Sequence, residues 1–559
     1  MKLRSFFVIL AVSSVVVLLL GLGLFYKLLG QSPLVVGTGG VNTTPAAAIF
    51  VPKRVPLMVS LLVNPDRIEA FEQVITPASQ RRRSHVEFNR IKKILLANTD
   101  LNYNRDIRPW LGNETTVALM TSDIDRNLKN GEQPGYLFAL STVDRELAAT
   151  TLTQFWQKES ASADVVSQPY KGVQITYRLP GEKKSHPLAT AILNRFVLVA
   201  NSPKVLREAI NNVQASSISL SQSQAYQRSL EQLSGGRVGL AYVNLGRWGL
   251  DWENATASIA AQPSLTVSMG LSPQGLLAKT ALVKVGTEEG KSIAPVLSEP
   301  AKAGQYLTGG STFAIAGTDL NHLWEQLSGT IAGNSGLETL VNQPIAILKE
   351  VWSIDLPQDV FNWVTGEYAL AMIPPRVKKP EADWIFVAEQ DSDQASEAIQ
   401  RLDELAIAEG YSLGTIELGE HTLTAWTTLN STADPISEDV DPEDILQALP
   451  KGVHTTIENY EVFTTSVETM EQALSLVPTE TLQDNPEFQM GFQQMPVASD
   501  GYLFLDWEAS QGFLKQQIPL LRLLELSAKP IFDHLRSLTI SSSGTVEGIS
   551  KATVFVKLR

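Results

Sequence analysis

Short runs of alternating apolar and polar residues recur along this chain, and the same pattern is written twice. Residues 191–199 and residues 455–463 each predict two neighbouring β-strands, and a helix is expected directly afterwards, at Ser202 or Ser466. A Ser side chain in that place caps the first turn of a helix and so marks its start. The two copies lie 264 positions apart, which is too far for a solenoid repeat and indicates a duplicated domain.

Further blocks repeat in the same order, each with a matching predicted element. Strands are predicted at 57–62, 116–120, 136–140, 239–243, 264–268 and 279–283, and again at 312–316, 368–372, 384–388, 501–505, 537–541 and 551–555. Helices are expected to begin near Asp144 and Asp393. Alternation with period two is typical of antiparallel strands with one wet face. The predicted fold class is α+β, with an N-terminal transmembrane helix followed by two tandem duplicated domains of antiparallel sheet with covering helices.

Five segments are predicted along the chain. They are a transmembrane signal-anchor at 1–30, a flexible linker at 31–47, a first α+β repeat at 48–287, an interdomain linker at 288–305 and a second α+β repeat at 306–559. The interdomain linker is placed where Gly and Pro residues interrupt all periodicity.

The predicted anchor is an apolar run from Ser5 to Tyr26, with 22 residues and no charge. That length spans a hydrocarbon core of about 30 Å, whereas the apolar region of a cleavable signal peptide has only about 7 to 15 residues. We therefore favour an uncleaved anchor over a cleaved signal. Because Lys2 and Arg4 precede the run, the N terminus is expected in the cytoplasm and the bulk of the chain outside it.

Charge separates the two copies. The whole chain has a net charge of -14, but residues 1–290 hold 30 Lys and Arg against 21 Asp and Glu, whereas residues 291–559 hold 15 against 38. The first half is therefore basic, at +9, and the second acidic, at -23. Such asymmetry bears on partners and on orientation near a charged surface, but not on fold.

Two charged segments are candidate contact sites. The basic patch consists of Arg81, Arg82, Arg83, Arg90, Lys92 and Lys93. It fits lipid head groups, an acidic partner or plain solvation, and nucleic acid is not expected outside the cytoplasm. The acidic loop consists of Glu438, Asp439, Asp441, Glu443 and Asp444 and occurs only in the second copy. A solvated loop is favoured over a Ca²⁺ site, because the spacing and central Gly of an EF-hand are missing.

The sequence holds no recognisable reaction centre. There is no Cys, and none of the six His residues has another at metal-ligand spacing, so no cofactor is expected, although a zinc site built from distant residues stays open. The segment 286–292 resembles a phosphate loop but lacks one residue and carries two acids. Common hydrolase signatures are also missing from the sequence.

The sharpest repeated motif is a Trp with an Asp four residues before it and a Glu four residues after it. It occurs around Trp110 and around Trp363. The two carboxylates could act as an acid and base pair. We favour a structural motif, with the Trp as a core anchor and the Asp as a cap, because a duplicated catalytic pair would be unusual.

These Asp-x-x-x-Trp-x-x-x-Glu blocks, the N-terminal apolar run and the segment Asn64-Pro65-Asp66 resemble an uncharacterised family of membrane-anchored proteins found chiefly in cyanobacteria. The resemblance implies a photosynthetic bacterial host and a periplasmic or thylakoid-lumenal home for residues 31–559. It supplies no activity, because that family is classed as a domain of unknown function.

Three functions fit these observations. The leading hypothesis is a membrane-anchored interaction or scaffold protein without catalytic activity, attached through residues 5–26 and bound to another envelope or thylakoid protein. The alternative is a carrier or binding module for a lipid or other apolar ligand. A hydrolase with a dispersed site is the third and least favoured.

Overall fold

The structure is a computed structural model. It describes residues 41, 43–64, 101–125, 127, 131, 133–161, 164–179, 188–245, 263–272, 274–283, 297–321, 324, 349, 354–375, 382–390, 393–431, 446–477, 480–517, 532 and 535–558.

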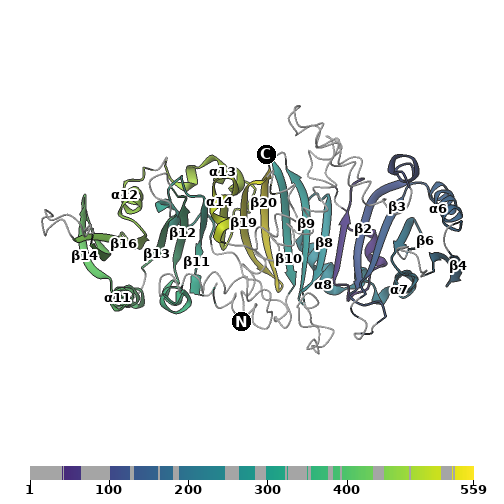
Figure 1. Cartoon of the computed structure of the whole chain (residues 1–559), viewed down its shortest axis with the longest axis horizontal. Coiled ribbons are helices and arrows are strands. Elements are labelled where there is room, and N and C mark those ends of the chain that lie inside the picture. The colour runs from purple at the N-terminus through teal and green to yellow at the C-terminus, as the bar shows by residue number, and fades with distance from the viewer. Residues whose placement is uncertain are drawn as a thin grey trace, which may run out of the picture.

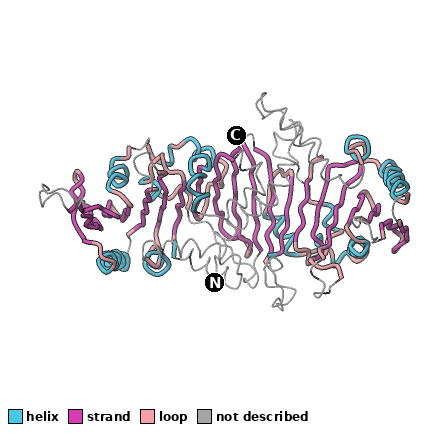
Figure 2. Tube along the Cα trace, in the orientation of Figure 1, coloured by secondary structure: helices cyan, strands magenta, loops and turns pink. Residues whose placement is uncertain are grey.

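The described strands form one antiparallel sheet of 20 strands that runs from end to end of an elongated molecule (Figures 1 and 2). The first copy supplies β1 (Leu57–Leu61), β2 (Leu111–Thr121), β3 (Gly135–Thr142), β4 (Val165–Tyr170), β5 (Val173–Arg178), β6 (Ala189–Leu193), β7 (Phe196–Ala200), β8 (Gly239–Asn244), β9 (Ser264–Ser272) and β10 (Gly275–Val283). The second copy supplies β11 (Phe313–Thr318), β12 (Glu367–Ile373), β13 (Asp383–Glu389), β14 (Ser412–Leu418), β15 (His421–Ser431), β16 (Leu446–Ile457), β17 (Tyr460–Thr464), β18 (Gly501–Asp506), β19 (Leu535–Val546) and β20 (Ile549–Leu558).

Seven described α-helices border this sheet: α6 (Arg145–Glu159), α7 (Pro203–Gln214), α8 (Gln224–Gln232), α11 (Asp393–Ala408), α12 (Val467–Ser475), α13 (Pro486–Phe492) and α14 (Trp507–Gln517). Short 3-10 or π turns include η2 (Ala46–Ile49), η3 (Tyr103–Ile107), η9 (Lys302–Tyr306) and η10 (Leu356–Val360). Two of the α-helices begin at the expected caps, since the Ser202 and Ser466 side chains accept backbone N–H groups of α7 and α12.

The duplication appears directly in the strand order. From one end, the first copy is ordered β4-β5-β6-β7-β3-β2-β1-β8-β9-β10. From the other end, the second copy is ordered β14-β15-β16-β17-β13-β12-β11-β18-β19-β20. Each strand of the second copy therefore occupies the place of the first-copy strand numbered ten lower.

The two copies join through equivalent strands. All of β10 pairs antiparallel with β20, from Gly275 opposite Lys557 to Val283 opposite Ile549, and Thr280 opposite Ala552 lies near the middle. A pseudo-two-fold axis therefore passes through this junction, with the same strand contributed from each side.

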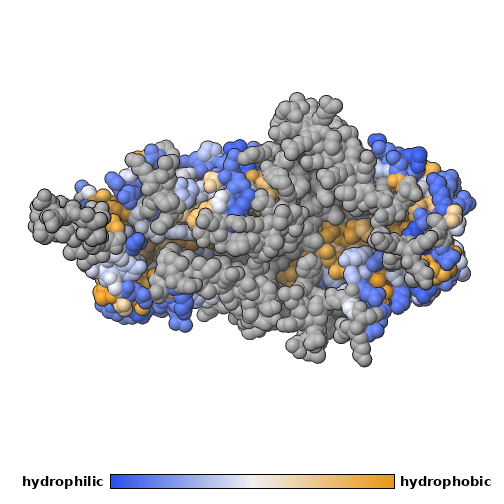
Figure 3. All heavy atoms as spheres, viewed as in Figure 1, coloured by the Kyte–Doolittle hydropathy of each residue, from blue (hydrophilic) through white to orange (hydrophobic). Residues whose placement is uncertain are grey.

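A shared hydrophobic core seals the junction. Leu276, Ala278 and Leu282 of β10 belong to the same buried cluster as Ala552, Val554 and Val556 of β20. Each copy also has its own core, which lies under α7 in the first copy and under α12 and α13 in the second. On the face shown in Figure 3, apolar side chains gather over β2 and β8, whereas polar side chains predominate around α6.

The sequence-based prediction of the fold class is wrong. Instead of two separate domains, each of sheet with covering helices, the described residues form one 20-stranded antiparallel sheet with a few helices. The error arises at the closing hairpins, which were expected to keep one wet face, whereas all nine residues of β9 are buried and β10 pairs with β20.

No helix in the described part of the chain is long and apolar enough to cross a membrane. Residues 5–26, on which the anchor prediction rests, lie outside the described residues, as do residues 31–40 of the first predicted linker and residues 288–296 of the second.

Candidate functional site

The structure describes only one of the three sets of candidate residues. The basic patch from Arg81 to Lys93 falls in the range 65–100, and the acidic loop from Glu438 to Asp444 falls in the range 432–445, both outside the described residues. Trp110 and Trp363 are described and buried, each with 1% of its surface exposed.

Both Trp motifs form the same hydrogen-bonded turn. The Trp110 indole N–H donates to the Asp106 carbonyl at 2.7 Å, and the Trp363 indole donates to the Asp359 carbonyl at 3.1 Å. The Asp106 carboxylate accepts the N–H of Asn102, four residues back, at 2.7 Å. In the same way, the Asp359 carboxylate accepts the backbone N–H of Asp355, four residues back, at 2.7 Å.

The Glu of each motif accepts backbone N–H groups from an earlier segment of the chain. Glu114 accepts the N–H groups of Ala46 and Ala47 at 3.0 and 2.7 Å and so fastens η2 to β2. Glu367 accepts the N–H of Ala303 in η9 at 3.1 Å. Burial raises the pKa of Glu114, and the bonds from Ala47 and Ala46 oppose that rise. In both copies the Glu therefore acts as a clamp on the preceding segment.

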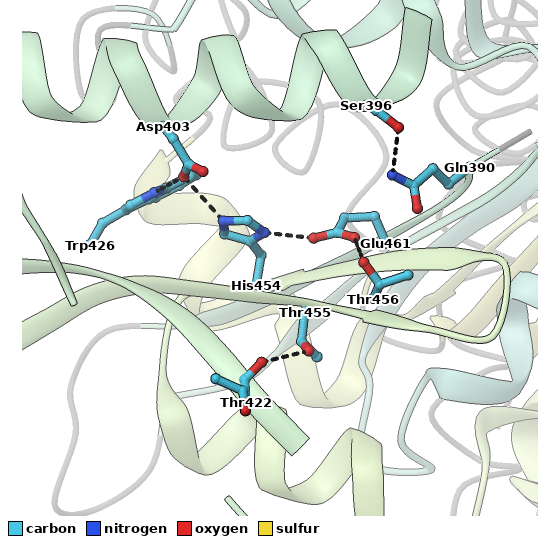
Figure 4. Close-up of polar contacts among 9 residues, drawn as sticks. All are labelled: Gln390, Ser396, Asp403, Thr422, Trp426, His454, Thr455, Thr456 and Glu461. Atoms are coloured by element: carbon cyan, nitrogen blue, oxygen red, sulfur yellow. Dashed lines mark hydrogen bonds and ion pairs between the residues drawn. The ribbon is translucent and has the colours of Figure 1, made fainter. Parts of the chain in front are cut away.

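A buried ionic cluster in the second copy is the strongest candidate site (Figure 4). His454 of β16 lies between two carboxylates, with Nδ1 at 2.6 Å from Glu461 Oε1 of β17 and Nε2 at 3.1 Å from Asp403 Oδ1 of α11. The Trp426 indole of β15 donates to the same Asp403 oxygen at 2.7 Å. One helix and three strands therefore meet at a single imidazole.

Two further contacts hold the Glu461 carboxylate and the His454 ring in place. Thr456 donates its hydroxyl to Glu461 at 2.7 Å, and the Phe463 ring stacks on the imidazole with 5.1 Å between centroids. The side chains of His454 and Glu461 are only 6% and 3% exposed, whereas that of Asp403 is 22% exposed. Asp403 is thus the member that faces solvent.

The carboxylates hold His454 in its charged form. Burial alone lowers the pKa of His454, but hydrogen bonds to Asp403 and Glu461 outweigh burial and raise that pKa to about 9. For Asp403 burial opposes ionisation, and the bonds from His454 and Trp426 bring its pKa below the usual range. An imidazolium with both N–H groups donated is therefore the ground state at neutral pH.

This arrangement ties elements together rather than offering a reactive group. Both ring nitrogens are engaged, so the imidazole has no free lone pair for a substrate proton or a metal ion. Among the described residues, no group of three or more His, Asp and Glu side chains is placed to hold a metal.

The first copy joins its helix to its sheet at the same place with other side chains. Thr190 occupies the position of His454, since Thr190 pairs with Val199 as His454 pairs with Phe463. Thr190 accepts the Trp156 indole N–H of α6 at 2.7 Å, and Glu159 of α6 forms an ion pair with Arg178 of β5. The helix-to-sheet connection is shared by both copies, but only the second copy makes it through a charged imidazole.

The spacing of the six His residues along the sequence does not single out His454. Its partner Asp403 lies 51 positions away, and spacing along the chain gives no sign that α11 crosses over β16. A comparison of Thr190 with His454 at the known 264-residue offset would have marked the position as one where the copies differ.

Comparisons with known proteins give a family but no activity. A family model described as "Protein of unknown function (DUF3352)" matches residues 10–558. No curated protein matches the chain. One similar solved structure, titled "Structure of crystal form I of TP0453", has 12% identity, covers 45% of this chain and 83% of its own, and has a TM-score of 0.21. A similarity of that size carries no argument about fold or function.

Proposed function

The chain belongs to the DUF3352 family of proteins of unknown function, and from this premise we propose that it is a non-catalytic interaction or scaffold protein. In this proposal residues 5–26 hold it at a membrane, and the rest of the chain lies outside the cytoplasm of a cyanobacterial host, in the periplasm or thylakoid lumen. Its partner is another protein of the same compartment.

The continuous sheet is the observation that carries this proposal. Because β10 and β20 pair along their full length, the two copies are parts of one body and lie toward its opposite ends (Figure 1). The basic first half of the sequence and the acidic second half are therefore joined through these paired strands. Such a bipolar body suits a protein that spans between two differently charged surfaces.

The basic half is the side that faces anionic lipid or an acidic partner in this proposal. Electrostatic attraction of this kind weakens with salt, because the screening length falls from about 10 Å at 0.1 M to about 3 Å at 1 M. The acidic half would then be directed away from that surface and left accessible to a second partner.

Cross-linking in isolated membranes, followed by affinity purification of the tagged full chain, tests the proposal. We expect a defined protein to be recovered at low salt, and the variant Arg81→Gln/Arg82→Gln/Arg83→Gln to recover less of it. The control Lys158→Gln/Lys171→Gln/Lys204→Gln removes the same charge from exposed positions of the same copy and should recover as much as the natural chain.

Two results would contradict the proposal. Recovery of no specific protein at low salt would remove its support. Recovery of a stoichiometric lipid without any protein would favour the alternative of a carrier for an apolar ligand.

A further inference from the structure

The sheet ends in two outer strands that differ in how well they are protected. β4 lies at the end of the first copy and β14 at the end of the second, and within the described part of the chain each pairs with one neighbour only. An edge strand presents a row of unpaired N–H and C=O groups, which is a template for another strand.

The turn of the β14–β15 hairpin shows which groups face outward. Leu418 and His421 close a two-residue turn in which Gly419 has a φ of 62°, so this pair is hydrogen-bonded. Every second residue back from Leu418 then bonds to β15, in agreement with Thr427 donating its hydroxyl to the Ser412 carbonyl. The remaining residues, Leu413, Thr415 and Glu417, direct their backbone groups to the free edge.

The same reasoning applied to β4 shows an interrupted edge. Tyr170 and Val173 close the turn, with positive φ at Lys171 and Gly172, and the outward residues are Val165, Ser167 and Pro169. Proline has no N–H, and within a sheet it is confined to such outer positions. Glu417 stands at the place of Pro169, so the interruption is missing from the second copy.

The surroundings of β14 are exposed and acidic. Residues 412–415 are all exposed, and the Leu413 side chain has 38% of its surface exposed. Glu409, Glu417 and Glu420 are likewise exposed around the strand. An extended segment laid along this edge would therefore meet carboxylates near both of its ends.

We propose that the outer edge of β14 binds an extended, Lys- or Arg-containing segment of a partner protein as an additional strand. This inference rests on the proposed function and specifies the class of partner. Backbone bonds to Leu413, Thr415 and Glu417 supply the affinity, and the acidic surroundings select a basic segment. A second copy of this chain is a poorer occupant, because β14 against β14 would bring two acidic ends together.

A labelled synthetic peptide with alternating Lys and Val residues, added to the detergent-solubilised full chain at low salt, provides the probe. We expect to detect binding by fluorescence anisotropy. The variant Thr415→Pro should lose at least tenfold in affinity, because it removes the backbone N–H that Thr415 directs to the free edge. The matched control is Ser167→Pro at the equivalent position of β4, which should bind as the natural chain does. The same peptide with Glu in place of Lys should not bind.

Amide exchange supplies a readout that does not depend on the variant folding. In the natural chain, exchange at residues 413–417 should slow when the Lys peptide is added, with no change at residues 165–169. Equal binding by Thr415→Pro and the natural chain would overturn the inference. So would a dimer of the natural chain that Thr415→Pro abolishes, because the occupant would then be a second copy.

A natural chain that binds no peptide would also overturn the inference. Recovery of a cross-linked protein from membranes would remain as a separate result, so the strand-addition site can fail while the interaction role stands.

Discussion

At the scale of single residues, the copies differ at buried positions where a neutral side chain in the first corresponds to a charged side chain in the second. Thr190 and Val197 correspond to His454 and Glu461, and the latter two are buried together. A buried charge is stable only while its partners stay in place. Removing one partner leaves the remaining charged groups buried without compensation and lowers the stability of the fold. The cluster therefore makes the stability of the second copy depend on pH.

The prediction for His454 concerns alkaline pH. Because its pKa in the folded chain, about 9, lies above the ordinary value of about 6.5, the stabilisation is fully present below pH 6.5 and is lost as pH rises through about 9. The full effect amounts to about 3 kcal/mol. Thermal melting between pH 6 and pH 10 should show this loss in the natural chain and a much flatter profile in His454→Gln, which should already be less stable at pH 7.

His421→Gln is the control, since His421 lies on β15 outside the cluster. It should keep the profile of the natural chain. A His454→Gln variant with an unchanged alkaline profile would show that the imidazolium contributes nothing to stability.

The Trp motif was accessible from sequence, because Trp110 and Trp363 recur with the same neighbours at a fixed offset. The His454 cluster was not accessible. Its members lie on one helix and three strands that are spread over the 59 residues from Asp403 to Glu461. Only the fold brings these side chains together.

At the scale of elements, α8 and α13 occupy equivalent places on the sheet but meet it differently. Ser229 of α8 hydrogen-bonds to Thr266 of β9 at 2.7 Å. Gly491 of α13 takes the place of Ser229, and a side chain there would overlap Thr539 Oγ1 of β19. The Thr539 hydroxyl is fully buried and has no hydrogen-bond partner among the described residues.

This pair of threonines gives a prediction with a built-in control. Thr266→Val should cost about 1 kcal/mol, because it removes one buried hydrogen bond without changing the shape of the side chain. Thr539→Val should be neutral or stabilising, because it removes a buried hydroxyl that has no hydrogen-bond partner within the described ranges. Melting temperatures of the two variants measure the difference, and equal losses would contradict it.

Helix starts and strand positions could be read from local pattern, since a Ser or Asp cap and a period of two act over a few residues. Asp144, for example, accepts the Leu147 N–H at the start of α6, where a cap was expected. Strand neighbours could not be read in this way. The sequence of residues 275–283 does not indicate that one edge of this strand pairs with residues 549–557 instead of being exposed to water.

At the scale of the whole molecule, the junction between the copies determines the shape. Nine residue pairs and a shared core join β10 to β20, so the halves are held by more than the chain that links them. An interface built like a domain interior should survive loss of that link.

A protease site inserted between residues 288 and 296 tests this expectation. After cleavage the two fragments should elute together in size-exclusion chromatography without denaturant. Adding Val554→Asp, a charge in the buried core of the junction, should separate them, whereas Val497→Asp at a position with 81% exposure should not. Fragments that separate without any substitution would show that the junction is weak.

The symmetry of this junction lies within one chain, and this allows the two copies to differ. In a two-fold dimer of identical chains, every substitution appears on both sides of the axis at once. Here the strands that meet at Thr280 and Ala552 belong to one polypeptide, so each side of the axis is encoded separately. A proline can then close one outer edge while the other stays open, and an imidazolium can appear under one helix alone, because a single gene holds two independently mutable halves.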